Sequence, residues 1–482
     1  MAQSGCWSMI KGGLTVDHDT EAELYFESEN SNIEVWVASV SLQPFTRSQW
    51  AEQQSKTIAK LRKRKVRFHV GNKQEKMIEG AKITIKQTRP HFPLGCALAS
   101  TILENEDYQN WFTSRFSFTA TTFDNEMKWY FTEKVRAQEN YTIADAMLAF
   151  AKKHGVSVRA HNIFWDDPTK NSNWVQSLPP EELLKASMTR IRSIMSRYAG
   201  EVIAWDVVNE NLHFSFFEDR LGPNASSMFY KIAQGLDYKT TMFLNEYNTL
   251  EQPGDLKSTP SQYLKKIRQI RSFPGNEEMV VGIGLESHFG KPNIPYMRAT
   301  LDILAETKMP IWLTELDVER GPNQAVYLEE IMREAYSHPA VKGIIVWSGW
   351  KPTGCSNMCL TDNNFNNLPA GDVVDKLIRE WKTQHLKGTT DVDGVFEQDV
   401  FCGKYSVTVL DPHSGVNLTR QVEVTNKDPH SGNPGRPCKN SAIRHFDGLD
   451  NPEWNDFECQ FTGLTGKAIK PDKNSLEKRE NK

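Results

Sequence analysis

Between residues 93 and 348, short apolar segments alternate regularly with longer amphipathic ones. The apolar segments are rich in β-branched residues, which is typical of strands buried on both faces of a sheet. A helix between successive strands returns the chain to the same edge, so the strands are parallel. The predicted strands are residues 93–99, 118–123, 156–165, 202–208, 240–248, 280–288, 310–315 and 341–348. This α/β pattern predicts a (β/α)8 TIM barrel.

Small β-rich additions are predicted on both sides of the barrel. Helices are expected at 143–154, 179–198 and, as the last barrel helix, about 372–386. The expected domains are a partial β-sandwich (1–50), a connector with a polar helix and short strands (51–91), the barrel (92–388), a small β extension containing a hairpin (389–428) and a disordered tail (429–482). The tail is predicted from its Pro, Gly, Asn and Lys content and its lack of periodicity.

Composition argues against several classes of partner. The net charge of −4 provides no basic field for nucleic acid. No run of about 18 apolar residues predicts a membrane span, and no metal or nucleotide motif is found, so no cofactor is expected. Seven cysteines in a long chain are no disulfide framework. Cys355 and Cys359 lie close together and would bridge in an oxidising compartment; their spacing alone is a weak zinc signal.

Two of the predicted strands end in carboxylates. Residues 202–210 read V-I-A-W-D-V-V-N-E and end on Glu210, and residues 310–317 read P-I-W-L-T-E-L-D and contain Glu315. In a parallel barrel the carboxyl ends of the strands meet at one mouth, where catalytic groups sit. Glycoside hydrolysis needs two carboxylates flanking the scissile bond. One such glutamate would more often be a solvated strand end or an ion-pair partner, but two on matching strands favour catalysis.

The motifs W-D-V-V-N-E and W-L-T-E-L-D-V resemble those of glycoside hydrolase family 10, the endo-1,4-β-xylanases, and are closest to the plant members. The resemblance covers roughly residues 92–387. It implies retaining, two-step hydrolysis of xylan, with Glu210 as acid/base and Glu315 as nucleophile. We expect burial and the nearby nucleophile to raise the pKa of Glu210, and hydrogen bonds to keep Glu315 ionised.

The resemblance also implies sugar-binding residues at the other strand tips. After the second strand, D-N-E-M-K matches the family at Asn125 and Lys128, but Asp124 replaces Glu. The third strand ends H-N-I-F-W-D. His161 and Trp165 match there, while an aspartate replaces the second histidine of the family pattern.

The later tips complete the expected site. Substrate-binding roles are implied for Asn209, Tyr247, His288 and Trp347, and Trp350 is expected to help wall the site. Supporting roles are implied for Asn245 and for Asp317, which would orient His288 against Glu315. Two further carboxylates stand out: Glu246, which resembles a second candidate acid, and Glu286, which stands where many members have Gln.

The first 50 residues resemble the C-terminal half of a family 22 carbohydrate-binding module. Because the other half of that sandwich is missing, we expect no binding of xylan by this segment alone. The family resemblance implies secretion to the cell wall or extracellular space, although no signal peptide is visible, and a monomer is expected. Sequons at Asn140, Asn224 and Asn417 would accept glycans in a secreted chain.

Two other functions remain open from the sequence. One is a barrel glycosidase of the same clan that acts on glucan or mannan. The other is a polysaccharide-binding protein without catalysis, against which the presence of both Glu210 and Glu315 argues.

Overall fold

The computed structural model describes residues 9–16, 18, 21, 23–26, 32, 34–72, 76–279 and 281–426, and the backbone of 456–464. The chain divides into two compact units. The barrel unit comprises residues 1–58 and 93–377, and the β unit comprises 59–92 and 378–482. Each unit has its own strands and its own core, and each is described by itself.

The barrel unit contains parallel strands in the order β3-β13-β12-β10-β9-β7-β5-β4. Its strands are β3 (Leu94–Cys96), β4 (Ala120–Thr122), β5 (Ser157–Ala160), β7 (Ala204–Asp206), β9 (Thr241–Glu246), β10 (Val281–Leu285), β12 (Ile311–Val318) and β13 (Val341–Val346). The first and last strands of this order also meet, since Thr119 N donates to Leu94 O at 2.8 Å and Leu98 N donates to Thr122 O at 2.9 Å. Every predicted barrel strand is therefore confirmed.

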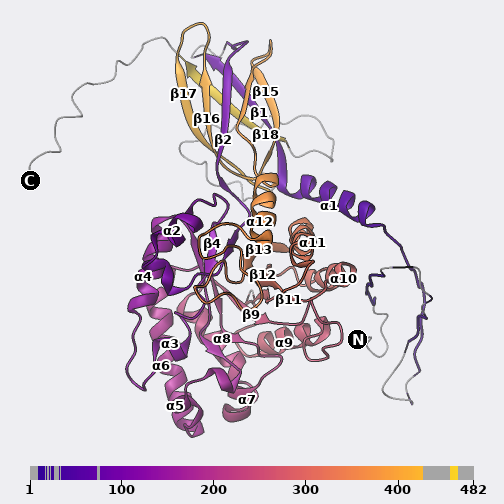
Figure 1. Ribbon diagram of the computed structural model, residues 1–482, viewed down its shortest axis with the longest axis vertical. Helices are drawn as coiled ribbons and strands as arrows, with labels where there is room; N and C mark the ends of the chain where they lie inside the picture. The colour runs from indigo at the N-terminus through magenta and orange to yellow at the C-terminus, as the bar shows by residue number, and fades with distance from the viewer. Residues whose placement is uncertain are drawn as a thin grey trace, which may run out of the picture. The chain divides into compact units, whose positions relative to one another are not determined.

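Helices surround these strands (Figure 1). They are α2 (Glu106–Thr113), α3 (Trp129–Thr132), α4 (Thr142–Lys153), α5 (Asn173–Gln176), α6 (Pro180–Tyr198), α7 (Phe216–Leu221), α8 (Ala225–Leu236), α9 (Pro260–Ser272), α10 (Ile294–Ala305), α11 (Gln324–Ser337) and α12 (Pro369–Glu380). The predicted helices at 143–154 and 179–198 match α4 and α6. The last helix ends at Glu380 rather than near residue 386, because Leu386 begins a strand of the β unit.

Short two-residue strands prolong the barrel at its carboxyl end. They are β6 (Phe164–Trp165), β8 (Val208–Asn209) and β11 (His288–Phe289). The first two pair with each other, and β11 pairs with β12. These pairings extend the regular backbone hydrogen bonding past the ends of the barrel strands and hold the strand tips in place.

The inside of the barrel combines small and large side chains in one layer. Ala120, Ala204, Phe243, Trp312 and Ile345 form a buried cluster there. Glycines face the large rings: a Cβ on residue 282 would overlap the Phe243 ring, and a Cβ on residue 343 would overlap the Trp312 ring. The alternation fills the taper of the barrel, which is therefore a packed core and not a pore.

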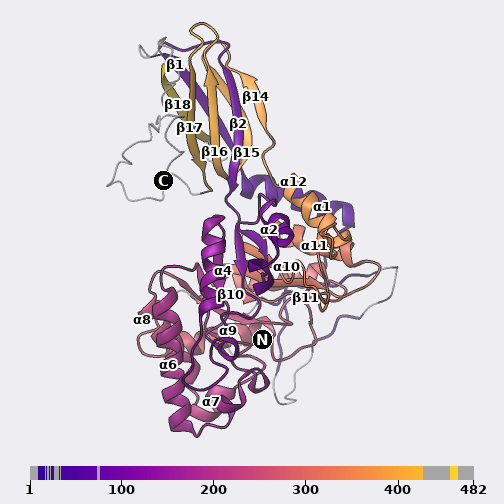
Figure 2. The same cartoon turned by 60° about the vertical axis from the view of Figure 1, so that its left-hand side comes forward.

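The β unit consists of two sheets, ordered β15-β1-β18 and β14-β2-β16-β17 (Figure 2). Its strands are β1 (Lys63–Asn72), β2 (Lys82–Pro90), β14 (Leu386–Thr389), β15 (Val395–Phe401), β16 (Gly403–Leu410), β17 (Asn417–Val424) and β18 (Asp456–Leu464). Alternate residues such as Phe68, Ile83, Ile85, Tyr405 and Val407 form one apolar core. The predicted connector and C-terminal extension are therefore parts of one domain, which corrects the predicted boundaries.

Two predictions at the chain ends also need correction. Residues 34–46 contain no strand, and helix α1 (Arg47–Arg62) follows them. The expected polar helix is thus confirmed, but the β structure expected here is wrong. Most side chains in 34–46 are exposed, so these residues have no second layer against which a strand could be buried. The carbohydrate-binding module stays a prediction.

The tail is the second correction. Residues 456–464, predicted to be disordered, form β18 and pair in parallel with β1. Their sequence, D-F-E-C-Q-F-T-G-L, alternates polar and apolar residues in the manner of a half-buried strand. The remainder of the predicted tail lies outside the described residues.

Other sequence features have a defined place. Cys355 and Cys359 form a disulfide, and Asn140, Asn224 and Asn417 are all exposed. In the described part of the chain, no helix has the length and apolar content needed to cross a membrane.

Candidate active site

The candidate site lies at the carboxyl ends of the barrel strands. Glu210 follows β8 directly and has φ of +58°, a left-handed conformation that a glutamate rarely adopts. Its N–H donates to Asn245 O at 2.9 Å. Three other non-glycine residues with positive φ also lie just past strand tips, namely Asn248, Ser287 and Ser348. Such strained positions cluster at functional sites.

One amide connects the two predicted catalytic glutamates. Asn245 Nδ2 lies 3.0 Å from Glu315 Oε1 and 3.0 Å from Asn209 Oδ1. The amide of Asn209 in turn lies 3.4 Å from Glu210 Oε1. Thr314 Oγ1 donates to Asn245 Oδ1 at 2.6 Å and fixes the orientation of the bridge. The structure therefore brings the tips of β8, β9 and β12 into one cluster, as predicted.

The predicted Asp–His–Glu chain is present beside Glu315. His288 Nδ1 lies 2.9 Å from Asp317 Oδ1, and His288 Nε2 lies 3.8 Å from Glu315 Oε2. Asn357 Nδ2 also donates to the carboxylate of Asp317, at 3.1 and 3.2 Å. Burial acts to lower the pKa of His288, but Asp317 and the two neighbouring glutamates raise it well above its usual value. A cationic His288 therefore faces the carboxylate of Glu315.

A second chain of contacts reaches Glu315 from inside the barrel. His161 Nε2 lies 3.7 Å from Glu315 Oε1, and His161 Nδ1 lies 2.9 Å from Asp206 Oδ2. Asp206 also pairs with Arg159 at 2.7 Å, and both residues are fully buried. Sequence reasoning identified His161 but missed Arg159 and Asp206. The available signal was a charge on each of two strands that are otherwise apolar.

The two glutamates have opposite acidities. Burial raises the pKa of Glu210 to about 7, and the negative charges of Glu246 and Glu315 add to this effect. Burial also acts to raise the pKa of Glu315, but His161, His288 and Lys128 overcome it and lower the value to about 2. One carboxyl group is thus suited to donate a proton and the other to remain a nucleophile.

Comparison with known proteins agrees with this geometry. Residues 85–377 match the family model for glycosyl hydrolase family 10. The chain belongs to glycosyl hydrolase family 10. It is similar to endo-1,4-beta-xylanase 5 of Arabidopsis thaliana, with 44% identity over 87% of this chain and 73% of that protein. Endo-1,4-beta-xylanase 4 of the same plant is also 44% identical, over 89% of this chain and 78% of that protein.

The solved structures confirm the fold of this family 10 member. Xylanase 10B from Thermotoga petrophila, crystallised with xylobiose, superposes with a TM-score of 0.53. The alignment covers 60% of this chain and 94% of that chain at 22% identity. Native xylanase 10B from Thermotoga maritima gives a TM-score of 0.52 over 60% of this chain and 97% of that chain, at 23% identity. The chain is accordingly a glycoside hydrolase with a TIM barrel.

Three of the predicted sugar-binding residues, Lys128, Trp165 and Trp347, form an aromatic and cationic group. Lys128 Nζ lies 4.4 Å from the centre of the Trp165 ring and 5.7 Å from that of Trp347. The Trp347 ring in turn packs edge-on against His161. Asn125 accepts a hydrogen bond from Tyr130. Flat rings beside polar groups suit a pyranose, which has apolar faces and polar edges.

Trp350, in contrast, is buried in the wall of the barrel. Its ring packs 5.0 Å from both Tyr108 and Phe365, and its Nε1 donates to Asn363. We therefore assign it to the support of the barrel wall and not to contact with the sugar.

The two departures from the family pattern have defined partners. Asp124 pairs with Lys351 at 2.7 Å, so its shorter side chain is held by a cation. Asp166 is fully buried and accepts from Asn211 Nδ2 at 2.5 Å and from Phe217 N at 3.0 Å. Burial raises the pKa of Asp166 to about 6. Asp166 thus ties the loop after β8 to the start of α7.

Glu246 is a structural carboxylate and not a second acid. It is fully buried and accepts from Leu212 N at 2.7 Å and from His213 Nδ1 at 2.6 Å. The His213 ring stacks on Tyr247, with 3.9 Å between ring centres. His213 was missed from the sequence, although it stands only three residues after Glu210; it positions the predicted sugar-binding Tyr247.

Proposed function

We propose that the chain is an endo-1,4-β-xylanase that cleaves plant cell-wall xylan by double displacement. The observation that carries the proposal is the opposed acidity of Glu210 and Glu315, two buried carboxyl groups connected through Asn209 and Asn245. Membership of family 10 and similarity to plant endo-1,4-beta-xylanases support xylan as the substrate.

In the first step Glu315 attacks the anomeric carbon of the sugar in the site. The bond from that carbon to the glycosidic oxygen breaks, and the oxygen takes the proton of Glu210. Asn209, hydrogen-bonded to Asn245, is placed to contact the sugar 2-hydroxyl, a contact that strengthens as the oxocarbenium forms. The result is a glycosyl ester on Glu315 and a free leaving chain.

In the second step the ionised Glu210 removes a proton from water. The water oxygen bonds to the anomeric carbon from the face that the leaving chain vacated, and Glu315 departs as a carboxylate. His161, His288 and Lys128 favour that departure because they stabilise its negative charge. Two inversions give net retention, for which the carboxyl groups should be roughly 5–5.5 Å apart.

We further propose that the enzyme works outside the cell and as a monomer. The Cys355–Cys359 disulfide is suited to an oxidising compartment, and the exposed sequon asparagines are accessible to glycosylation.

The test is hydrolysis of xylan, β-glucan and mannan by purified protein, with the products of arabinoxylan identified. We expect xylo-oligosaccharides whose new reducing ends are initially β. Faster hydrolysis of glucan or mannan would reassign the substrate, initial α products would exclude retention, and binding without cleavage would leave the non-catalytic alternative.

A further inference from the structure

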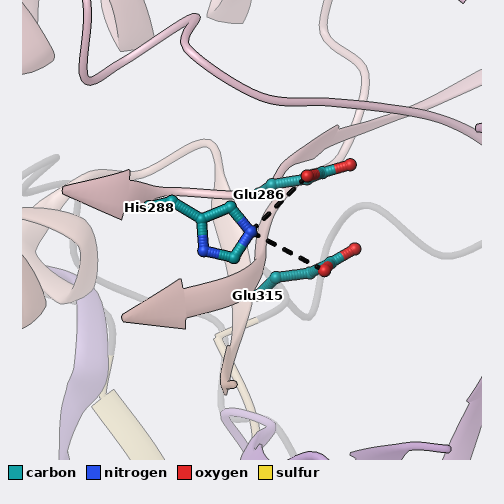
Figure 3. A group of neighbouring side chains, drawn as sticks. All are labelled: Glu286, His288 and Glu315. Carbon is teal, nitrogen blue, oxygen red and sulfur yellow. Dashed lines mark ion pairs between the residues drawn. The ribbon is translucent and has the colours of Figure 1, made fainter. Parts of the chain in front are cut away.

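A third carboxyl group lies inside the catalytic cluster. Glu286 directly follows β10 and is 3% exposed. Its Oε1 lies 3.1 Å from Asn245 Nδ2, and its Oε2 lies 3.5 Å from His288 Nε2. Figure 3 shows the side chains of Glu286 and Glu315 converging on the same nitrogen of His288. One atom from each of these three residues lies within 4.8 Å of the other two.

The two donors that Glu286 and Glu315 share have too few hydrogens to satisfy two ionised carboxylates. Asn245 Nδ2 carries two hydrogens but faces acceptors on Asn209, Glu286 and Glu315, at 3.0, 3.1 and 3.0 Å. His288 Nε2 offers at most one hydrogen, which Glu286 and Glu315 must share. An extra proton on one of the carboxyl groups would supply the missing donor.

The surrounding charges decide which carboxyl group holds that proton. The groups that face Glu286 are Glu210 after β8, Tyr247 after β9, His288 on β11, Glu315 on β12 and Lys128 before α3. Burial, then the charges of Glu315 and Glu210, raise the pKa of Glu286 well above its usual value. His161 Nε2 lies 3.7 Å from Glu315 Oε1 and helps to lower the pKa of Glu315, so that residue is held ionised and Glu286 takes the proton.

We propose that Glu286 is a positioning residue that works in its neutral form and donates its O–H toward the ionised Glu315, one oxygen of which lies within 4.8 Å of an oxygen of Glu286, as the amide of a glutamine would. A metal ion bound by Glu286, His288 and Glu315 would occupy the carboxylate of Glu315, the nucleophile. We therefore interpret the cluster as one in which the carboxyl groups share a proton. The inference deepens the proposed function and rests on it.

Ionisation of Glu286 would impair the nucleophile in two ways. A second carboxylate would compete with Glu315 for Asn245 Nδ2 and His288 Nε2, which lie within reach of both. It would also repel the negative charge that returns to Glu315 in the second step, which makes Glu315 a poorer leaving group. The neutral form avoids both effects and leaves Glu315 as the charged acceptor in the cluster.

The first test measures the protonation state directly and needs no substrate. Infrared difference spectra of wild type minus Glu286→Gln, recorded at about pH 6, should show a positive protonated carboxyl C=O band that the variant lacks. Other protonated carboxyl groups are common to both proteins and cancel. Loss of an ionised carboxylate band instead would overturn the proposal, whether or not xylan is the substrate.

The second test measures activity with three proteins. Glu286→Gln keeps a neutral donor. The kcat/KM of this variant on an aryl xylobioside at about pH 5 should therefore stay within about threefold of the wild-type value. Glu286→Leu cannot donate and should lose at least about tenfold, with circular dichroism confirming that it is folded. Equal losses in two folded variants would contradict the proposal.

The third test uses pH. With a dinitrophenyl xylobioside, departure of the leaving group needs little acid, so loss of the proton from Glu210 does not limit formation of the glycosyl ester. The burst rate of wild type should fall at high pH as Glu286 ionises, and this fall should be absent in Glu286→Gln. The same fall in both proteins would assign it to another group and overturn the proposal. Failure of every protein on xylosides, with the infrared result intact, would instead reject the proposed substrate.

Discussion

The two sides of the barrel mouth shift the pKa of a buried glutamate in opposite directions. On the side formed by β8 and β9, burial, with the added effect of the nearby carboxylate of Glu246, raises the pKa of Glu210 to about 7. On β12, Glu315 faces His288 from β11 and His161 from just past β5, and its pKa falls to about 2. Both glutamates are buried, with exposed fractions of 9% and 6%.

Burial therefore does not distinguish the two roles. Removing a carboxylate from water raises its pKa wherever it lies. The signs of the neighbouring charges decide the outcome, and those neighbours are themselves positioned by second partners: His161 by Asp206, and His288 by Asp317. If this comparison is correct, variants on the two sides should fail in different ways.

The largest loss is expected for Glu315→Ala. Without the carboxylate no glycosyl ester forms, so kcat should fall by about 10⁴-fold or more on xylan and on aryl xylobiosides alike. Initial rates on both substrates test this, with thermal unfolding as the control for folding. Substantial turnover of either substrate would mean that Glu315 is not the nucleophile.

Glu210→Ala should differ with the leaving group. On xylan the loss of the general acid should cost about 10²–10⁴-fold, but on a dinitrophenyl xylobioside the first step needs little protonation and should be much less affected. The glycosyl ester should then accumulate, because no base activates water.

Azide rescue of both variants tests which glutamate has which role. In Glu210→Ala, azide should attack the ester and give a β-glycosyl azide. In Glu315→Ala, it should attack the substrate directly from the vacated face and give the α-azide. NMR assignment of the anomeric centre decides between them, and swapped configurations would reverse the two roles.

A smaller effect is expected for Asp317→Asn, which acts through His288. Loss of the negative charge lowers the pKa of His288, which then stabilises ionised Glu315 less well. The pKa of Glu315 should rise, so the acidic limb of the pH profile of kcat/KM should move to higher pH by about one unit. Asn357→Ala is the matched control: it removes a hydrogen bond to Asp317 but keeps the charge, and should shift the limb less.

The sequence was sufficient for the barrel because each strand is a separate apolar segment with a clear boundary. It also placed Glu210, Glu315, His288 and Asp317 correctly, since residues at the ends of parallel strands must meet at one mouth. Local pattern was thus enough wherever the barrel geometry itself brings residues together.

Long-range pairing was not visible in the same way. Arg159 and Asp206 lie on different strands and form an ion pair. The local sequence around either residue does not show that the other residue neutralises its charge. The β unit was divided into two segments for the same reason: β2 pairs with β14 and β16, which follow some 300 residues later. Alternation shows that a strand exists but not which distant strand completes its sheet.

The smallest expected effect tests whether charges at a distance set the acidity of Glu210. Glu246 is held by His213 and by backbone N–H groups, and its negative charge raises the pKa of Glu210. Glu246→Gln removes that charge with little change in shape, so ionised Glu210 becomes less unfavourable and its pKa falls. Since the acid must be protonated, the basic limb of kcat/KM on xylan should move to lower pH by about half a unit or more.

Glu251→Gln is the matched control for this prediction. Glu251 is a buried glutamate near the same strand tip, but it accepts from the backbone N–H groups of His288 and Leu250 and is not among the main charges that raise the pKa of Glu210. Its replacement should leave the basic limb in place. If both variants shift the basic limb of the pH profile equally, general loosening of the mouth is responsible. If neither variant shifts it, burial alone sets the pKa of Glu210. The contrast between the two sides of the mouth would then rest only on the cations around Glu315.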